Sequence, residues 1–151
     1  MKNRSINTRF WSDGFIVSLD PIGRYLFLYF LTNERTEICG VYELPMAVIE
    51  RETGLSTGEI GRCLELFHGR IDVIDGWVSL ANFTKYHVFT ADGQKGVDRG
   101  LAAVPAYILA KIAQKKGPTP LPPPSHYRPA DVPFPNPNLN PNPSGGKRGG
   151  E

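Results

Sequence analysis

The chain has 151 residues, a formal net charge of +2 and 14 prolines, 11 of which lie within residues 117–151. This length holds about one domain, and a segment so rich in proline cannot bury enough apolar surface to offset its ordering entropy. We therefore expect residues 117–151 to be a disordered Pro/Asn/Gly-rich tail. The charged N-terminus lacks an apolar signal core, and no segment reaches the roughly 20 apolar residues of a membrane span, so we expect a cytoplasmic protein.

The first predicted helix begins at Asp20 and Pro21, because aspartate is a good N-cap and proline suits the first helical turn. Residues 25–31 are all apolar or aromatic, so this helix must be covered on more than one side. The simpler interpretation is the central core helix of a small domain. The alternative is that part of it forms a homo-oligomer interface, with Tyr25, Phe27 and Leu28 as the candidates, together with Trp77 further along the chain.

Two further helices are predicted to meet at a short turn. The first has Pro45 at its first position and ends at Gly54. The second begins near Thr57, because Ser56 and Glu59 have the spacing of a capping box. Its apolar residues recur at the spacing of one helical face, and Gly69 suits a stop just beyond it. That stripe consists of Ile60, Cys63, Leu64 and Phe67.

A β-hairpin follows, because Asp75-Gly76 is a two-residue turn between two apolar runs. The turn pairs Ile74 with Trp77, and the alternation of strand residues then separates two faces. The first face, with Ile71, Val73, Val78 and Leu80, is expected in the core. The second is mixed, with Asp72, Ile74, Trp77 and Ser79, and leaves Trp77 near the tip. Trp77 either packs on a neighbouring loop or on the segment around Phe83 and Tyr86, or it is an exposed contact for DNA or protein.

Helix, turn, helix and hairpin is the order of a winged helix-turn-helix, so we predict an α+β fold, mainly α with a small β-hairpin wing, over residues 1–90. Residues 91–116 form a short helical extension with two helical patterns, 94–104 and 105–116. The sequence leaves open whether these helices pack on the domain or project from it.

Little catalytic chemistry is visible. The histidines are scattered, neither cysteine lies at ligand spacing from one, and no glycine loop has a phosphate-binding pattern. Cys39 and Cys63 are expected to be structural thiols in a reducing compartment. We therefore predict neither an enzyme nor a cofactor or metal site.

Charge along the chain is uneven. Residues 1–90 carry 9 Lys/Arg against 11 Asp/Glu, whereas residues 91–116 carry 5 against 2. The acidic balance of the first segment argues against strong DNA binding, which depends on phosphate neutralisation. The candidate DNA contacts are Thr57 and Arg62 on the capped helix, Trp77 on the wing, and a basic N-terminal arm. That arm consists of Lys2, Arg4 and Arg9.

Residues 4–87, taken together, resemble the N-terminal winged-helix domain of phage replisome-organiser and DnaD-like replication initiation proteins. The strings Cys39-Gly40-Val41-Tyr42-Glu43 and Asp75-Gly76-Trp77 are the most specific part of the resemblance. The matching residues are 6–11, 19–21, 25–29, 32–33, 38–43, 53–55, 75–78 and 82–83. No Trp follows Trp77, so the tyrosine-to-tryptophan signature of the second DnaD-like helical domain is missing.

The resemblance implies a replication-initiation protein of phage or prophage origin that binds double-stranded DNA, contacts replication proteins of the host and associates with itself. The alternative is a non-catalytic oligomerising adaptor whose winged helix contacts protein and not DNA. The basic arm favours the first hypothesis, and the acidic balance of residues 1–90 favours the second.

Overall fold

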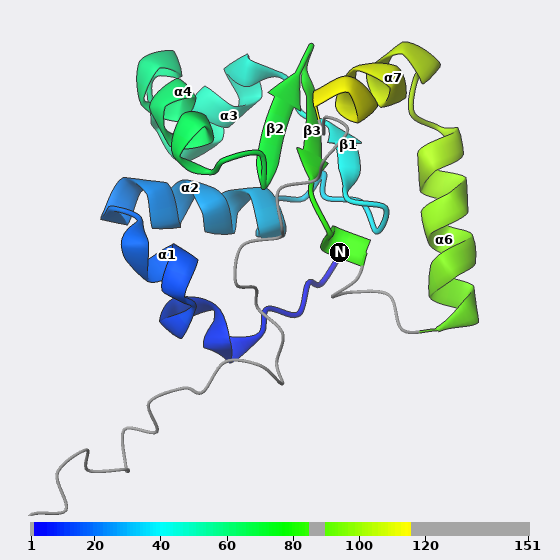
Figure 1. Ribbon diagram of the computed structural model, residues 1–151, viewed down its shortest axis with the longest axis horizontal. Helices are drawn as coiled ribbons and strands as arrows, with labels where there is room; N and C mark the ends of the chain where they lie inside the picture. Colours follow the sequence, from blue (N-terminus) through cyan, green and yellow to red (C-terminus); the bar gives the residue numbers. More distant parts are fainter. Residues whose placement is uncertain (1, 85–89, 116–151) are drawn as a thin grey trace, which may run out of the picture.

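The computed structural model describes residues 2–84 and 90–115, which form a mixed α+β structure with a three-stranded sheet (Figure 1). Its order of elements is compatible with a winged helix. The first elements are the 3-10 helix η1 (Thr8–Ser12), α1 (Gly14–Ser18), α2 (Pro21–Thr32), β1 (Val41–Glu43), α3 (Met46–Thr53) and α4 (Thr57–Leu66). They are followed by β2 (Ile71–Ile74), β3 (Trp77–Leu80), α6 (Ala91–Ala102) and α7 (Ala106–Lys115). The predicted tail, residues 117–151, lies outside the described residues.

The helices before the sheet begin and end as their local signals predict. An oxygen of Asp20 accepts the amide of Gly23 at 2.8 Å and caps α2. The capping box of α4 is complete, with Glu59 N to Ser56 Oγ at 3.2 Å and Ser56 N to Glu59 Oε2 at 2.8 Å. Gly54 ends α3 in the left-handed region, at a φ of 74°. One difference is that Pro45 is the N-cap of α3 and not its first helical residue. The short helices η1 and α1 were not predicted from the sequence.

The hairpin has the predicted register. Ile71 pairs with Leu80 and Ile74 with Trp77, and both turn residues have positive φ, 49° at Asp75 and 78° at Gly76. A third strand, β1, pairs antiparallel with β3 and gives the order β1-β3-β2. The strand β1 was not predicted from the sequence, because three residues are too few to show an alternating pattern.

One face of the sheet forms the main core with the helices that precede the β2–β3 hairpin. The rings of Phe27 and Phe67 meet edge to face, with centroids 5.1 Å apart, and join α2 to the end of α4. The helical residues fully buried in this core include Leu26, Phe30, Ile49, Ile60 and Cys63. The sheet contributes Tyr42, Ile71, Val78 and Leu80. The prediction that α2 is a core helix and that Cys63 faces inward is therefore confirmed.

The other face of the sheet, which the sequence predicts to be mixed in composition, is covered as well. A second cluster joins Val41 and Ile74 of the sheet to α6 and α7. The helical members of this cluster are Val97, Val104, Ile108 and Ile112. The two helices therefore pack on the domain and do not project from it, and the sheet lies between two helical layers (Figure 1).

Candidate nucleic-acid interface

The predicted recognition element is α4, which follows α3 after a turn of three residues, 54–56. Its outer face carries exposed Thr57, Gly58 and Arg62, and a Cβ added at Gly61 would meet no atom within 4 Å. The backbone of this face is therefore open to close approach. The Thr57 hydroxyl donates to the Glu50 carboxylate of α3, which joins the two helices at the turn.

Arg62 is held by a residue from another helix. Its Nη2 lies 3.0 Å from Oδ2 of Asp20, the N-cap of α2. The two side chains are 45% and 43% exposed, so the pair lies at the surface. Asp20 is 42 positions away in the chain, and no local sequence signal could have identified it as a partner.

The predicted N-terminal arm folds back onto the loop before β1. Lys2 Nζ lies 2.7 Å from Glu37 Oε1, and Arg4 donates to the carbonyl oxygen of Thr36. Arg9 lies in η1 and is partly buried. These contacts anchor the arm to the fold, so it does not extend freely into solvent.

Trp77 does not project from the tip of the hairpin. It is partly buried against the second core cluster. The hairpin is also tied to α7, since Lys111 contacts the Asp75 carboxylate and Lys115 Nζ lies 3.4 Å from Asp72. Of the two interpretations of Trp77, packing on the fold is therefore supported and the exposed contact is wrong, because the face that carries Trp77 is covered by α6 and α7. Tyr86, its other expected neighbour, lies outside the described residues.

The candidate interface residues of α2 are mostly committed to the fold. Phe27 contacts the rings of Phe15 and Phe67, and Leu28 is partly buried against the main core. Tyr25 is 46% exposed, and its hydroxyl donates to the carbonyl oxygen of Thr53 at 3.1 Å. Of the three, Tyr25 alone presents a large exposed surface to a second copy.

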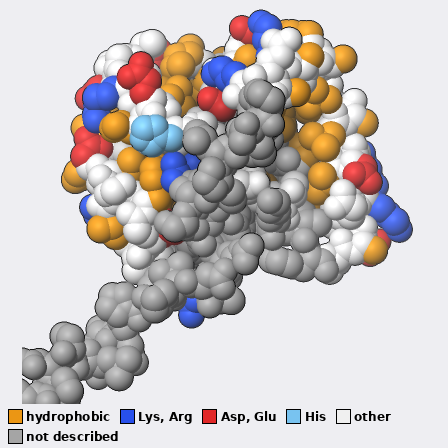
Figure 2. Space-filling view, viewed as in Figure 1, with side chains coloured by type: hydrophobic (Ala, Val, Ile, Leu, Met, Phe, Trp, Pro, Cys, Tyr) orange, Lys and Arg blue, Asp and Glu red, His pale blue; other side chains and the backbone are white. Residues whose placement is uncertain are grey.

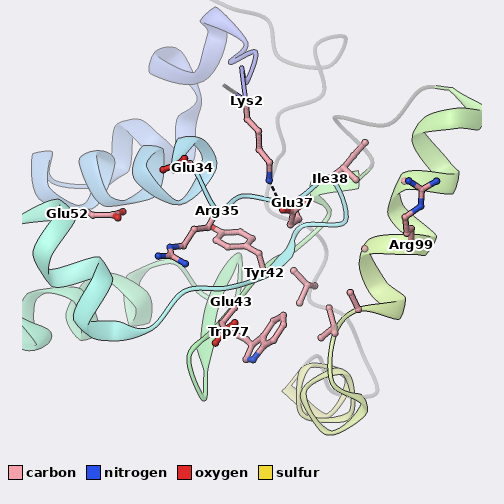
Figure 3. A pocket seen from close by; sticks show the side chains of 15 residues that line it. Lys2, Glu34, Arg35, Glu37, Ile38, Tyr42, Glu43, Glu52, Trp77 and Arg99 are labelled. Atoms are coloured by element: carbon pink, nitrogen blue, oxygen red, sulfur yellow. Dashed lines mark hydrogen bonds and ion pairs between the residues drawn. The ribbon is translucent and has the colours of Figure 1, made fainter.

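The six predicted DNA contacts thus do not form one surface. Thr57 and Arg62 lie on α4, whereas Lys2 and Trp77 line a different region, a cleft of about 880 Å³ beside β1 and α6 (Figure 3). The cleft is bordered by four acidic side chains and three basic ones. They are Glu34, Glu37, Glu43 and Glu52, with Lys2, Arg35 and Arg99. Arg35 and Arg99 were not among our predicted site residues.

Charges of both signs are mixed over the surface. Figure 2 shows basic and acidic side chains interspersed on one face of the molecule, with no patch of a single sign. The described residues carry 12 Lys/Arg against 13 Asp/Glu. Any affinity for DNA that resides in the described residues must therefore come from a few placed side chains and not from a general positive field.

Burial and hydrogen bonds shift several ionisable groups. The pKa of Asp20 is lowered, mainly by the Gly23 amide and also by Arg62. The pKa of Glu59 is lowered by its bonds to Ser56. Cys39 and Cys63 are free cysteines. Burial raises the pKa of both thiols, which makes them poorly reactive.

Within residues 2–84 and 90–115, no cluster of three His, Cys, Asp or Glu side chains could hold a metal ion, and no helix has the length and apolar character that a bilayer crossing requires. Comparison with models of known protein families, with curated proteins and with solved structures finds no match.

Proposed function

We propose that the protein is a DNA-binding winged helix-turn-helix protein with a role in replication initiation, of phage or prophage origin. The observation that carries the proposal is α4: a capped helix, placed after a short turn from α3, that exposes Thr57, Gly58 and Arg62. Recognition helices read the major groove with residues of their N-terminal half.

The composition of this face suits contact with a duplex. Glycine at positions 58 and 61 lowers the stability of the helix relative to alanine. Packing does not require glycine at either position, because a Cβ at Gly58 would meet only the Ser56 hydroxyl, at 3.9 Å, and a Cβ at Gly61 would meet nothing within 4 Å. Their absence of side chains lets a phosphate backbone approach the helix closely. Arg62 is the basic residue of α4, and arginine pairs with phosphate or with guanine.

The role in replication rests on the resemblance of residues 4–87 to phage replisome organisers and DnaD-like proteins. It brings with it double-stranded DNA as ligand, replication proteins of the host as partners, and self-association. Tyr25 on α2 is the exposed aromatic residue that a second copy would bury.

Fluorescence anisotropy with a labelled mixed-sequence duplex, titrated at two salt concentrations, tests DNA binding. We expect Arg62→Ala to weaken binding and to reduce the salt slope by about 0.9, the value of one lost phosphate contact. Removal of residues 1–9 should flatten the salt dependence further. Arg99→Ala, an equal loss of charge on α6, is the matched control and should leave the affinity nearly unchanged. Unchanged binding by both Arg62→Ala and the truncated chain would refute the model.

A second candidate function is supported by the cleft beside β1. Because the sheet order is β1-β3-β2, β1 is an edge strand, and its residues Val41, Tyr42 and Glu43 all line the cleft. An edge strand in a cleft is suited to an extended peptide that adds to the sheet. This arrangement and the near-neutral charge favour an oligomerising adaptor that binds protein.

The two functions separate in a measurement of mass. Light scattering at tens of micromolar protein, roughly the range that populates micromolar interfaces, should give a dimer or larger under either proposal. Under the adaptor proposal, Glu43→Lys in the cleft reduces that mass, whereas Glu65→Lys on α4 does not. A strictly monomeric wild-type protein would refute self-association, and an adaptor of this kind with it.

A further inference from the structure

The pair between Asp20 and Arg62 joins the predicted reading helix to another element. Asp20 uses its two oxygens differently: Oδ1 caps α2 through the Gly23 amide at 2.8 Å, and Oδ2 holds Arg62 Nη2 at 3.0 Å. The cap therefore fixes the orientation of the carboxylate independently of its contact with Arg62. Because α2 packs against α4, the distance between the two side chains is set by the core.

Stability does not explain the pair. Both side chains are more than two-fifths exposed, and ion pairs at that exposure contribute little to folding. The cap itself requires no charge, because asparagine caps a helix about as well as aspartate. What the negative charge adds is its effect on Arg62.

The neighbouring charged residues are engaged elsewhere, so the charge of Asp20 acts mainly on Arg62. Along α4 the other charged residues are Glu59, which is bound in the capping box, and Glu65, which is exposed; the Cys63 thiol is buried, and its pKa is raised. Arg24 is also close to Asp20, but its guanidinium donates to the carbonyl oxygens of Leu19 and Val17 at the end of α1. Arg62 is thus the group that Oδ2 of Asp20 orients and neutralises.

We propose that Asp20 is a positioning residue for DNA recognition, which holds Arg62 in one orientation and suppresses its attraction to phosphate on non-cognate duplex. This inference rests on the proposed DNA-binding function. A guanidinium has five N–H donors, so Arg62 keeps donors for a ligand while Nη2 is on Asp20. The nearby carboxylate repels a phosphate, and a correctly placed base acceptor suffers less from that repulsion.

The test is Asp20→Asn, which keeps the cap of α2 and removes the charge. With a labelled mixed-sequence duplex, we expect this variant to bind several-fold more tightly than wild type, with a salt slope steeper by about 0.9 because one more phosphate contact forms. In an Arg62→Ala background the same change should have no such effect. Glu65→Gln is the matched control: it removes one negative charge from α4, and its effect should be the same with and without Arg62.

A second measurement does not depend on DNA. The carboxyl pKa of Asp20, followed by NMR, should rise in Arg62→Ala while remaining below its ordinary value, because the Gly23 amide still holds the carboxylate. An unchanged pKa would show that the pair is absent in solution and would overturn the inference.

The outcomes distinguish this inference from the proposed function. If wild type binds DNA but Asp20→Asn acts equally with and without Arg62, the inference is wrong and DNA binding stands. If Asp20→Asn binds and wild type does not, suppression by Asp20 is supported directly. If none of the variants binds duplex DNA, both proposals are overturned.

Discussion

The packing of α6 on the sheet depends on Gly100, and replacement by alanine measures how closely the two elements meet. A Cβ at this position would lie 2.9 Å from Cys39 Sγ and 3.1 Å from Cys39 Cβ. Cys39 is buried, and its Sγ donates to the carbonyl oxygen of Val41 at 3.1 Å, so it has little room to move. The helix or the loop before β1 must therefore shift to admit the methyl group.

Two opposing terms decide the size of the effect. Alanine is favoured over glycine inside a helix by about 1 kcal/mol. Overpacking a well-packed site costs about 1–3 kcal/mol. We therefore expect Gly100→Ala to be neutral or to destabilise the protein by up to about 2 kcal/mol. Gly61→Ala has the same gain in propensity and open space around its Cβ, and should stabilise by about 1 kcal/mol.

The comparison of the two variants is the assay. Chemical denaturation should give free energies of unfolding that differ by about 1–3 kcal/mol, and melting temperatures that differ by at least about 4 °C for a domain of this size. Cys39→Ala should partly rescue Gly100→Ala, because it removes the closer of the two contact atoms. If Gly100→Ala stabilises the protein as much as Gly61→Ala does, α6 is not seated against Cys39 and the description of the second core is wrong.

Three further predictions concern the fold. Tyr42→Phe should cost about 1–2 kcal/mol, because the buried hydroxyl donates to the carbonyl oxygen of Phe30 at 2.6 Å; Tyr25→Phe, with an exposed hydroxyl, is the control and should cost little in the same denaturation assay. Burial raises the pKa of Tyr42 to about 12 from 10.0, so the folded state holds the phenol proton more tightly than the unfolded state does. The free energy of unfolding that is present below pH 10 should therefore fall as the pH rises toward 12. This loss should be smaller in Tyr42→Phe, and a loss of equal size would contradict the assignment. Ile108→Ala, at a fully buried position of α7, should cost about 2–5 kcal/mol, whereas Lys111→Ala should leave the unfolding midpoint nearly unchanged because its ion pair with Asp75 is exposed; the reverse order would mean that charge and not packing holds α7.

Local signals predicted much of the first eighty residues correctly. Each signal acts over at most three positions in the chain. Asp20 and the pair Ser56 and Glu59 make hydrogen bonds to nearby backbone amides, and Asp75-Gly76 adopts the positive φ angles of a tight turn. Such signals are read from the sequence because the partners are neighbours in the chain. The same reasoning gave the correct register of the hairpin, since a two-residue turn leaves one pairing.

Features that depend on distant partners were not predictable in this way. The strand β1 has three residues and owes its existence to β3, which lies more than thirty residues later. The helices α6 and α7 show an apolar stripe, but the stripe does not say which surface it covers. The alternation of the hairpin placed Trp77 correctly on the second face, and only the second core cluster shows that this face is buried.

The covering of that face changes where a duplex could be read. A wing that leads with an aromatic side chain needs a free second face, and here α6 and α7 occupy it, with Lys111 and Lys115 on the two aspartates of the hairpin. The acidic wing is neutralised from within the chain, so it neither attracts nor strongly repels phosphate. Under the proposed function, recognition would therefore depend on α4 alone among the elements of the predicted winged helix, and on α4 Nη2 of Arg62 lies 3.0 Å from Oδ2 of Asp20. A recognition helix with one restrained arginine is suited to discriminating among DNA sites, but by itself it would give low affinity. Self-association would therefore matter to the proposed function, because two copies double the DNA contacts without adding a basic surface to either copy.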